Sequence, residues 1–478
     1  MSYGAKALMV SDNGAMPVSV SSATHSAATR RPPGPDRYLY GKTIEGMRDA
    51  LNFNMINWKN YGDSIYFPAF PGFGWYLFVH PSAVEQILQT NQSNYQKPMR
   101  FLQPFGYLGG RGLLTNEGEH WRKQRRLIQP SFHRERLAAL GDAMSQAVCQ
   151  QVQEWEKLPE GQIIDLFSEM SKLTFRVIGR TLFGDDLSDK APAFFTSLEH
   201  SIEHISNRMN SPVLIPDWLP TPANQRFHQH RNVLDDVVYG IIERRQSLTE
   251  PPQDLLDMLM KSTFEGTDEG MNIRQLRDEI MTLLISGHET VALSLTWALF
   301  LLGENRHVEA VLLDELKSVL DGNPAKMENL PKLPYNKMVY NEALRLYPPI
   351  WGQPREAIAD DEIQGFRVEK GLPVTVCQYF THRHPEFFPE PERFNPERFL
   401  PENEAQLPKF AFFPFGGGSR SCIGNHFAMA EGQMALATIL QRFKFELLEG
   451  QNVEPKAGCT LRPAKPIKVR LKKRTAPL

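Results

Sequence analysis

The sequence contains few cysteines and almost no net charge. Its four cysteines are scattered over 478 residues without a CxxC pair, which excludes the common zinc spacings and a dense disulfide framework and fits a reducing compartment. The formal net charge is only −2, so nothing in the charge balance indicates binding to nucleic acid. The length is sufficient for one large domain or for two or three ordinary ones.

The first 35 residues lack the long apolar run of a secretory signal or a membrane anchor. They are rich in Ser, Ala, Val and Gly and almost free of acids, a composition that leaves a cleaved organelle transit peptide open. Residues 30–35, Arg-Arg-Pro-Pro-Gly-Pro, form a stiff lead-in to a folded body. We expect a flexible tail at 1–31, a folded domain at 32–478, and a soluble cytoplasmic monomer without an integral membrane anchor.

Helical patterns dominate the remaining sequence, and no internal repeat or low-complexity linker interrupts it. Amphipathic helices are predicted around 40–55, 81–90, 134–156, 165–182, 227–247 and 274–303. Short β-like segments are predicted at 64–69 paired with 75–79, at 363–368 paired with 373–377, and at 466–471. The fold class is therefore mainly α with small β-sheets, in a single large domain.

Residues 280–302 form a nearly continuous apolar run that is long enough to cross a membrane. An imidazole, His288, and a carboxyl, Glu289, interrupt this run near its middle, and both are costly in lipid. We therefore expect a buried central helix, broken where function needs it, and not a membrane span.

The segment 415–424, Phe-Gly-Gly-Gly-Ser-Arg-Ser-Cys-Ile-Gly, places Cys422 directly before an amphipathic helix expected from about 423 to 442. The N–H groups and dipole of the helix start, together with the cation Arg420, favour a thiolate. The glycines allow a tight turn around the sulfur, and Phe415 can shield it from water. Such a thiolate is what a haem iron needs as axial ligand for O–O bond cleavage. A phosphate-binding loop is excluded, because Cys-Ile stands where it needs a Lys-Ser/Thr pair.

A second candidate segment, 286–290, reads Ser-Gly-His-Glu-Thr within the apolar run. Gly287 would let a flat ligand or O₂ approach the backbone closely. The Thr290 hydroxyl can loosen the helix locally and hold a water, and Glu289 can relay protons through water. We therefore predict that Thr290 and Glu289 are catalytic residues that deliver protons, with the Ser286 hydroxyl nearby.

Both segments resemble signatures of the cytochrome P450 family, Phe-x-x-Gly-x-Arg-x-Cys-x-Gly at 415–424 and Ala/Gly-Gly-x-Asp/Glu-Thr at 286–290. Three further segments are similar to family motifs and occur in the expected order, so that the resemblance covers about 32–473. It implies the cytochrome P450 fold, one helix-rich domain around a buried haem. It also implies that Cys422 is the ligand of the iron and that Gly424 belongs to the haem-binding turn.

The Glu342-x-x-Arg345 segment, with Arg398 downstream in Phe-Asn-Pro-Glu-Arg-Phe, resembles the family motifs that brace the cysteine loop. The resemblance implies a buried network of these three residues with a structural role and no part in the chemistry.

Trp121 and Arg125 are four residues apart, on one face of a predicted helix. They resemble the Trp-x-x-x-Arg pair that contacts a haem propionate, and Arg355 and Arg420 match further propionate-binding positions. Arginine suits carboxylates because its planar fork binds both oxygens. The neighbouring cations form a solvated face or a patch for an acidic electron donor: Arg122, Lys123 and Arg126.

The resemblance implies a haem b monooxygenase of the soluble bacterial type, which inserts one oxygen atom of O₂ into a hydrophobic substrate by hydroxylation or epoxidation. The chain is too short for a fused reductase and shows no flavin or iron–sulfur pattern. Electrons are therefore expected from NAD(P)H through separate partners, a ferredoxin or flavodoxin with its reductase.

The expected pocket walls are apolar or aromatic and favour a hydrophobic substrate of fair size, such as a terpene, fatty acid, carotenoid or polyketide. These wall residues are Phe101, Leu102, Phe105, Tyr107, Leu283, Leu284, Ile350, Trp351, Thr460 and Leu461. Two alternatives stay open: a haem-thiolate isomerase or dehydratase acting on peroxides, which usually lacks the acid–alcohol pair, and a non-enzymatic haem or gas-binding protein.

Overall fold

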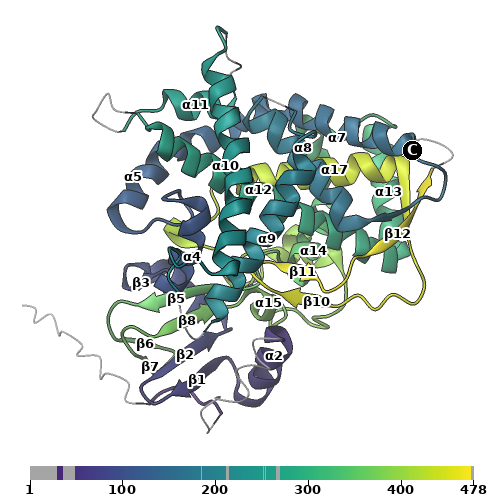
Figure 1. The fold of residues 1–478 in the computed structure, drawn as a ribbon. Coiled ribbons are helices and arrows are strands. Elements are labelled where there is room, and N and C mark those ends of the chain that lie inside the picture. Colours follow the sequence, from purple (N-terminus) through teal and green to yellow (C-terminus); the bar gives the residue numbers. More distant parts are fainter. Residues whose placement is uncertain are drawn as a thin grey trace, which may run out of the picture.

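The computed structural model describes residues 30–35, 49–184, 186–211, 215–250, 252, 254–264 and 270–474. In this part of the chain helices predominate and the strands are short, as the sequence predicts (Figure 1). Most of the expected flexible tail at 1–31, and much of the helix expected at 40–55, lie outside the described residues.

The longest helix, α12 (Ile273–Glu304), lies in the middle of the fold and contacts α8, α10, α14 and α17. The other helices are α2 (Ala50–Tyr61), α3 (Pro81–Glu85), α4 (Met99–Gly109), α5 (Gly118–Ile128), α6 (Arg134–Ala139), α7 (Gly141–Glu156), α8 (Leu166–Leu182), α9 (Ala191–Asn210), α10 (Pro222–Gln246), α11 (Leu255–Lys261), α13 (Arg306–Leu320), α14 (Pro334–Leu346), α15 (Gln378–Thr381), α16 (Pro401–Glu404) and α17 (Asn425–Arg442).

Helix α12 begins with a capping box, in which Asn272 and Gln275 each bond the backbone N–H of the other at 2.9 Å. It is the one helix among the described residues that is long and apolar enough to cross a membrane, but 72% of its most apolar window is buried inside the fold. The break predicted near 286–290 is absent. The hydroxyls of this segment donate to carbonyls four residues back, which is compatible with an unbroken helix.

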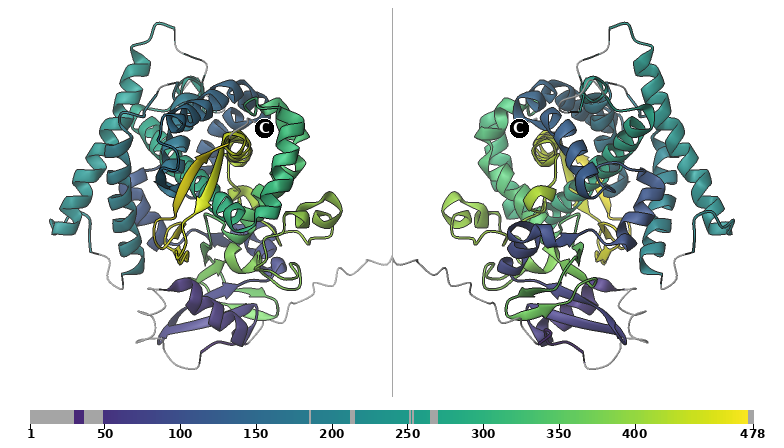
Figure 2. Two further views of the ribbon diagram at one scale, coloured as in Figure 1. Left: turned by 90° about the vertical axis from the view of Figure 1, so that its right-hand side faces the viewer. Right: turned by 90° about the vertical axis from the view of Figure 1, so that its left-hand side faces the viewer.

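Helix α17, which follows the candidate cysteine, is also a core helix. In Figure 2 this yellow helix is seen nearly end-on and enclosed by other helices. Its residues from Ala430 to Gln441 are buried almost without interruption. Two long central helices, α12 and α17, therefore supply a rigid frame for the residues between and beside them.

The largest sheet has the strand order β1-β2-β8-β5-β3 and lies at one end of the helical body (Figure 1). Its strands are β1 (Ser64–Phe70), β2 (Phe73–Phe78), β8 (Pro373–Val376), β5 (Gln353–Ala357) and β3 (Tyr95–Gln96), and the predicted pairing of 64–69 with 75–79 is confirmed. The smaller sheets consist of β4 (Ile163–Asp165), β12 (Lys468–Lys473) and β9 (Phe443–Leu447), of β10 (Pro455–Ala457) and β11 (Leu461–Pro463), and of β6 (Asp361–Ile363) and β7 (Phe366–Val368).

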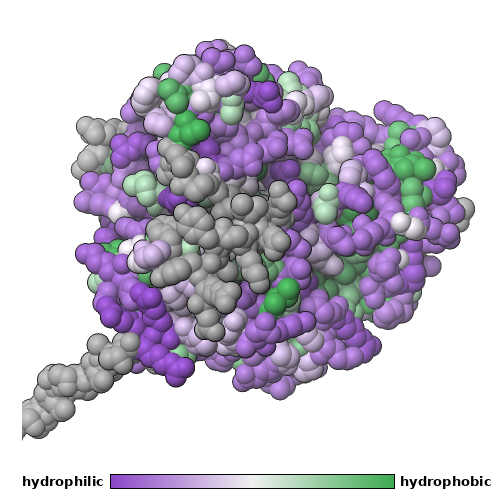
Figure 3. Space-filling view, turned by 60° about the horizontal axis from the view of Figure 1, so that its bottom comes forward, coloured by the Kyte–Doolittle hydropathy of each residue, from purple (hydrophilic) through white to green (hydrophobic). Residues whose placement is uncertain are grey.

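The predicted pairing of 363–368 with 373–377 is wrong. A turn at Gln364 and Gly365, with φ of 52° and 77°, reverses the chain inside the expected strand, so that β6 pairs with β7. Strand β8 pairs instead with β5 and with β2, which is far away in the sequence. On the face shown in Figure 3 the surface is mostly hydrophilic with small, separate apolar groups, as expected when the apolar helices are inside.

Candidate active site

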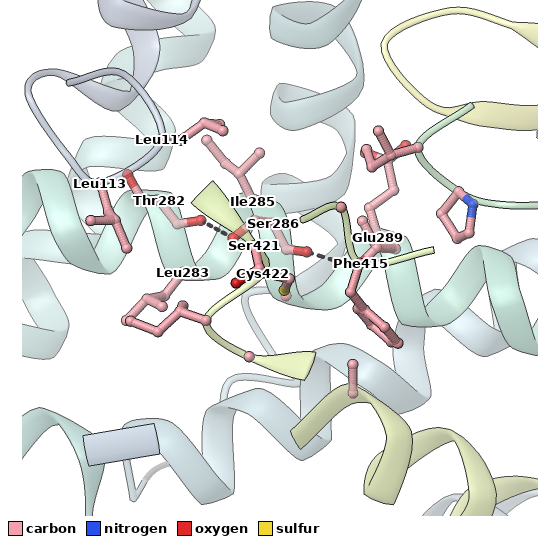
Figure 4. Close-up of a pocket in the computed structure, with 18 of the residues that line it drawn as sticks. Leu113, Leu114, Thr282, Leu283, Ile285, Ser286, Glu289, Phe415, Ser421 and Cys422 are labelled. Atoms are coloured by element: carbon pink, nitrogen blue, oxygen red, sulfur yellow. Dashed lines mark hydrogen bonds between the residues drawn. The ribbon is translucent and has the colours of Figure 1, made fainter. Parts of the chain in front are cut away.

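A cavity of about 400 Å³ lies between α12 and the segment that carries Cys422. Figure 4 shows Ser421 and Cys422 facing the stretch of α12 from Thr282 to Glu289. All ten site residues predicted from the sequence line this cavity: Trp121, Arg125, Gly287, Glu289, Thr290, Arg355, Phe415, Arg420, Cys422 and Gly424. The fold therefore brings together residues that are up to about 300 positions apart in the sequence.

A tight glycine-rich turn presents the Cys422 sulfur to the cavity. The Cys422 N–H donates to the Phe415 carbonyl at 2.8 Å and closes this turn. Gly418 has a φ of 65°, and a Cβ there would lie 1.8 Å from the Leu88 carbonyl oxygen, so only glycine fits. Helix α17 begins at Asn425, two residues later than predicted.

Cys422 is exposed at the surface of the cavity, but desolvation by the surrounding protein raises the pKa of its thiol and outweighs the opposing effects of the Gly424 N–H and of Arg125. The expected preference for a thiolate is thus wrong for the protein alone, since loss of hydration is larger than the attraction of these groups. Arg420 was the predicted cation, but it forms an ion pair with Glu117. Arg125, whose Nη1 donates to the Ser421 carbonyl at 2.9 Å, is the nearby cation instead.

Four cations, Lys97, Arg125, Arg355 and Arg420, share the same wall of the cavity. Burial lowers the pKa of Lys97 to about 7 and that of Arg355 and of Arg420 to about 10. Glu117 is the one acid among the described residues whose charge acts on three of these cations. The group therefore carries excess positive charge, which fits a ligand with two carboxylates.

Contacts with uncharged groups also hold the side chains of this wall in place. The Arg420 guanidinium carbon lies 3.6 Å from the centre of the Trp121 ring and its Nη1 donates to the Asn116 carbonyl at 3.0 Å. The Lys97 ammonium donates to the Leu114 carbonyl. Lys97 was missed in the sequence, because a single lysine before a proline belongs to no motif and only the fold brings it to the arginines.

On α12 the hydroxyls of Thr282, Ser286 and Thr290 follow one another at every fourth residue and all line the cavity. They donate to the carbonyls of Asp278, Thr282 and Ser286 at 2.8, 2.6 and 2.8 Å. A Cβ on Gly287 would lie 2.9 Å from the Ile178 Cδ1, so a larger residue here would displace the end of the Ile178 side chain on α8. From the sequence, Gly287 is explained only by the close approach of a ligand.

Glu289 lies on α12 too, but its carboxylate is already paired. Its Oε1 accepts hydrogen bonds from Thr460 Oγ1 at 2.6 Å and from Arg462 Nε at 2.8 Å, and the Arg462 Nη2 lies at 2.7 Å. The side chain of Glu289 is buried, so this ion pair is shielded from water. No sequence pattern indicates Arg462 as a partner, because it is 173 residues away.

The predicted bracing network is confirmed. Arg345 forms two hydrogen bonds with Glu342, at 2.7 and 2.8 Å, and Arg398 Nε lies 3.4 Å from the same carboxylate. Arg345 also donates to the His382 carbonyl at 2.8 Å, and His382 Nε2 accepts the Phe413 N–H at 2.9 Å. Burial lowers the pKa of His382, which keeps the ring neutral and able to accept. The network thus reaches the segment that leads into the Cys422 turn.

Half of the predicted pocket walls are correct. Phe101, Phe105, Leu283, Ile350 and Thr460 line the cavity, whereas the other five do not: Leu102, Tyr107, Leu284, Trp351 and Leu461. The five incorrect residues are neighbours of true wall residues, and their side chains point elsewhere, because the position of a residue in a helix or strand decides the direction of its side chain.

Three basic residues of α5 are exposed: Arg122, Lys123 and Arg126.

A thiol, four cations that are buried or half-buried, and apolar walls around one cavity define a site for an iron porphyrin, whose propionates would meet the cations and whose flat ring would meet the walls. The chain matches the Cytochrome P450 family model over residues 32–471. Cyclooctatin synthase of Streptomyces melanosporofaciens is 34% identical, over 81% of this chain and 84% of that protein. Cyclooctat-9-en-7-ol 5-monooxygenase of the same organism is 32% identical (86% and 88%), and pentalenene oxygenase of Streptomyces avermitilis is 31% identical (91% and 96%).

The chain therefore belongs to the cytochrome P450 family. It is a haem b monooxygenase that acts on a hydrophobic substrate with O₂, and it receives electrons from NAD(P)H through redox partner proteins.

Proposed function

We propose that this monooxygenase hydroxylates or epoxidises a terpenoid. The observation that carries the proposal is the cavity in which Cys422 faces α12 between apolar walls. Relatives whose printed names concern cyclooctatin, cyclooctat-9-en-7-ol and pentalenene support this substrate class.

In this proposal Cys422 ligates the iron, and Phe415 and Gly424 belong to the turn that surrounds the sulfur. Trp121, Arg125, Arg355 and Arg420 hold the propionates, and Lys97 joins them because it lies in the same cationic wall. When bound there, haem b supplies the reductive activation of O₂, in which one oxygen atom enters the substrate and the other leaves as water. These positions match both the family signature and the charge of the cavity wall.

The protein orients the substrate, excludes water from the cavity and supplies protons. The apolar walls orient the substrate and exclude water, and Gly287 keeps the backbone of α12 accessible. The Thr290 hydroxyl holds a proton or a water beside the reacting atoms. Glu289 would supply further protons after the contact with Arg462 opens, because the carboxylate is otherwise held by Arg462 and Thr460.

We further infer a soluble, cytoplasmic monomer, with a flexible tail at 1–31 and the catalytic domain at 32–478. Its electron donor would be an acidic ferredoxin or flavodoxin, served by a reductase. The exposed basic residues of α5, Arg122 and Lys123, offer part of a complementary surface.

The test is turnover of cyclic terpenes with NADPH, a ferredoxin and its reductase. Mono-oxygenated product that contains one atom of labelled O₂ is expected. Rearrangement of a fatty-acid peroxide without reductase, and no oxygenation of any terpene, would indicate the isomerase class instead. Stable O₂ binding without electron consumption would indicate a carrier or gas sensor.

A further inference from the structure

Glu279 is a carboxyl in the wall of the cavity that the chemistry described above does not use. Its side chain is only 1% exposed and it lines the cavity. Its Oε2 accepts the Leu113 N–H at 3.0 Å, whereas its Oε1 has no hydrogen-bond partner among the described residues. Burial, with a smaller contribution from Asp278, raises the pKa of Glu279 to about 8. At pH 7 the carboxyl is therefore mostly protonated and able to donate a hydrogen bond.

Contact with the segment 110–114 accounts for the hydrogen bonding of only one of the two carboxyl oxygens of Glu279. The segment 110–114 lies against α12, where Gly110 and Gly112 leave no room for a Cβ beside Asp278 and Thr282. The Leu113 N–H in this segment satisfies Oε2. A buried polar atom without a partner is unfavourable, so the free Oε1 indicates a ligand.

Thr282 provides a complementary group one turn further along α12. Its hydroxyl donates its own proton to the Asp278 carbonyl at 2.8 Å, which leaves its lone pairs free to accept. Glu279 and Thr282 are three residues apart and both line the cavity. Figure 4 shows Thr282 beside Leu113 and Leu114. Glu279 and Thr282 thus offer one donor and one acceptor within an apolar stretch of wall.

We propose that Glu279 and Thr282 bind a hydroxyl group of the substrate, so that the enzyme prefers a terpenoid alcohol to the hydrocarbon of the same skeleton. The substrate oxygen accepts from the carboxyl of Glu279, and its O–H donates to Thr282 Oγ1. An ether or ketone satisfies only the first of these bonds, and a hydrocarbon satisfies neither. The inference rests on the proposed function, because the alcohol occupies the same cavity.

The spacing along α12 also limits the size of the substrate. Ser286, which lies above Cys422 in Figure 4, is seven residues from Glu279, or about 10 Å along the helix axis. An alcohol anchored at Glu279 and oxidised near Ser286 therefore needs a skeleton about that long, which fits a sesquiterpenoid or diterpenoid.

The experiment compares farnesol, farnesyl methyl ether and farnesene by equilibrium dialysis against the haem-loaded protein. The affinity of each ligand for a variant is compared with its affinity for the wild type, so that differences in hydrophobicity between the ligands cancel. Glu279→Leu should weaken the binding of farnesol and of the ether about tenfold, because loss of a hydrogen bond to a buried partner has that effect. The affinity for farnesene should not change. Thr282→Val, which keeps the shape, should weaken only farnesol. Glu279→Gln should retain farnesol, since its amide both accepts from Leu113 and donates.

Unchanged farnesol affinity in both Glu279→Leu and Thr282→Val overturns the proposal. An equal loss of all three ligands overturns it as well, because that indicates a disturbed cavity. If Glu279→Leu does not fold, Thr282→Val alone decides, by its effect on farnesol relative to the ether. If the variants show no effect of the ligand hydroxyl but the wild type oxidises farnesene, the proposed hydroxyl site is wrong and the terpenoid function stands. If none of the three ligands binds, both proposals are wrong.

Discussion

Replacing Arg345 by alanine should destabilise the protein by several kcal/mol and cause loss of haem. Arg345 and Glu342 are both completely buried, with 0% of either side chain exposed. The variant leaves Glu342 with only the Asn395 N–H at 2.9 Å and the distant Arg398, and it removes the donors to the carbonyls of His382, Pro391 and Arg393.

The magnitude follows from these contacts. Breaking a buried ion pair costs about 3–5 kcal/mol, because one charge remains without its partner. The three carbonyls that lose a donor each add about 1–3 kcal/mol where water cannot reach them. The sum is comparable to the whole stability of an ordinary domain, about 5–15 kcal/mol, so little folded protein should remain.

A matched control is available in the same region. Arg393 and Glu390 form an ion pair at the same i, i+3 spacing, but 63% and 69% of their side chains are exposed. Arg393→Ala should change the free energy of unfolding by no more than about 1 kcal/mol. Urea unfolding and haem content of both variants test the reasoning. An Arg345→Ala protein that is as stable and as haem-loaded as Arg393→Ala would refute the bracing network.

Three further predictions concern single residues. Lys97→Ala should speed the transfer of haem to apomyoglobin several-fold, because one of four cations in the propionate wall is lost; an unchanged rate would exclude Lys97 from that wall. Arg462→Ala should lower the free energy of unfolding in urea by about 1.5–3 kcal/mol, since Glu289 then keeps only its bond from a threonine; no loss would show the pair to be unimportant. Burial raises the pKa of Glu431 well above its usual range, so wild-type stability from this group is present at low pH and lost as pH rises; Glu431→Gln should therefore stabilise more at pH 8 than at pH 5, and an equal effect at both would contradict this.

The sequence predicts those parts of the site that lie in one short segment. The turn before Cys422 and the segment 286–290 are local patterns, because glycines, an arginine and a cysteine at fixed spacing need no partner from elsewhere. The pairing of Glu342 with Arg345 is local as well, since i and i+3 share a helix face.

The other parts depend on contacts between distant segments. Arg462 reaches Glu289 from a strand 173 residues away, and Glu279 meets the Leu113 N–H across 166 residues. No periodicity or motif marks such partners. The predicted lowering of the Cys422 thiol pKa was wrong for a similar reason. Desolvation by the surrounding protein raises this pKa by more than the start of the helix beside it lowers it. The same holds for β8, whose partners β2 and β5 were set by tertiary packing.

The most direct test of the account is the carbon monoxide difference spectrum of the reduced, haem-loaded protein, recorded beside Cys422→Ser. We expect a strongly red-shifted Soret band for the wild type that disappears in the variant, because the Cys422 sulfur supplies the thiolate ligand. A histidine-type band in the wild type, or a red-shifted band that survives in Cys422→Ser, would contradict ligation by Cys422 and the monooxygenase mechanism that depends on it.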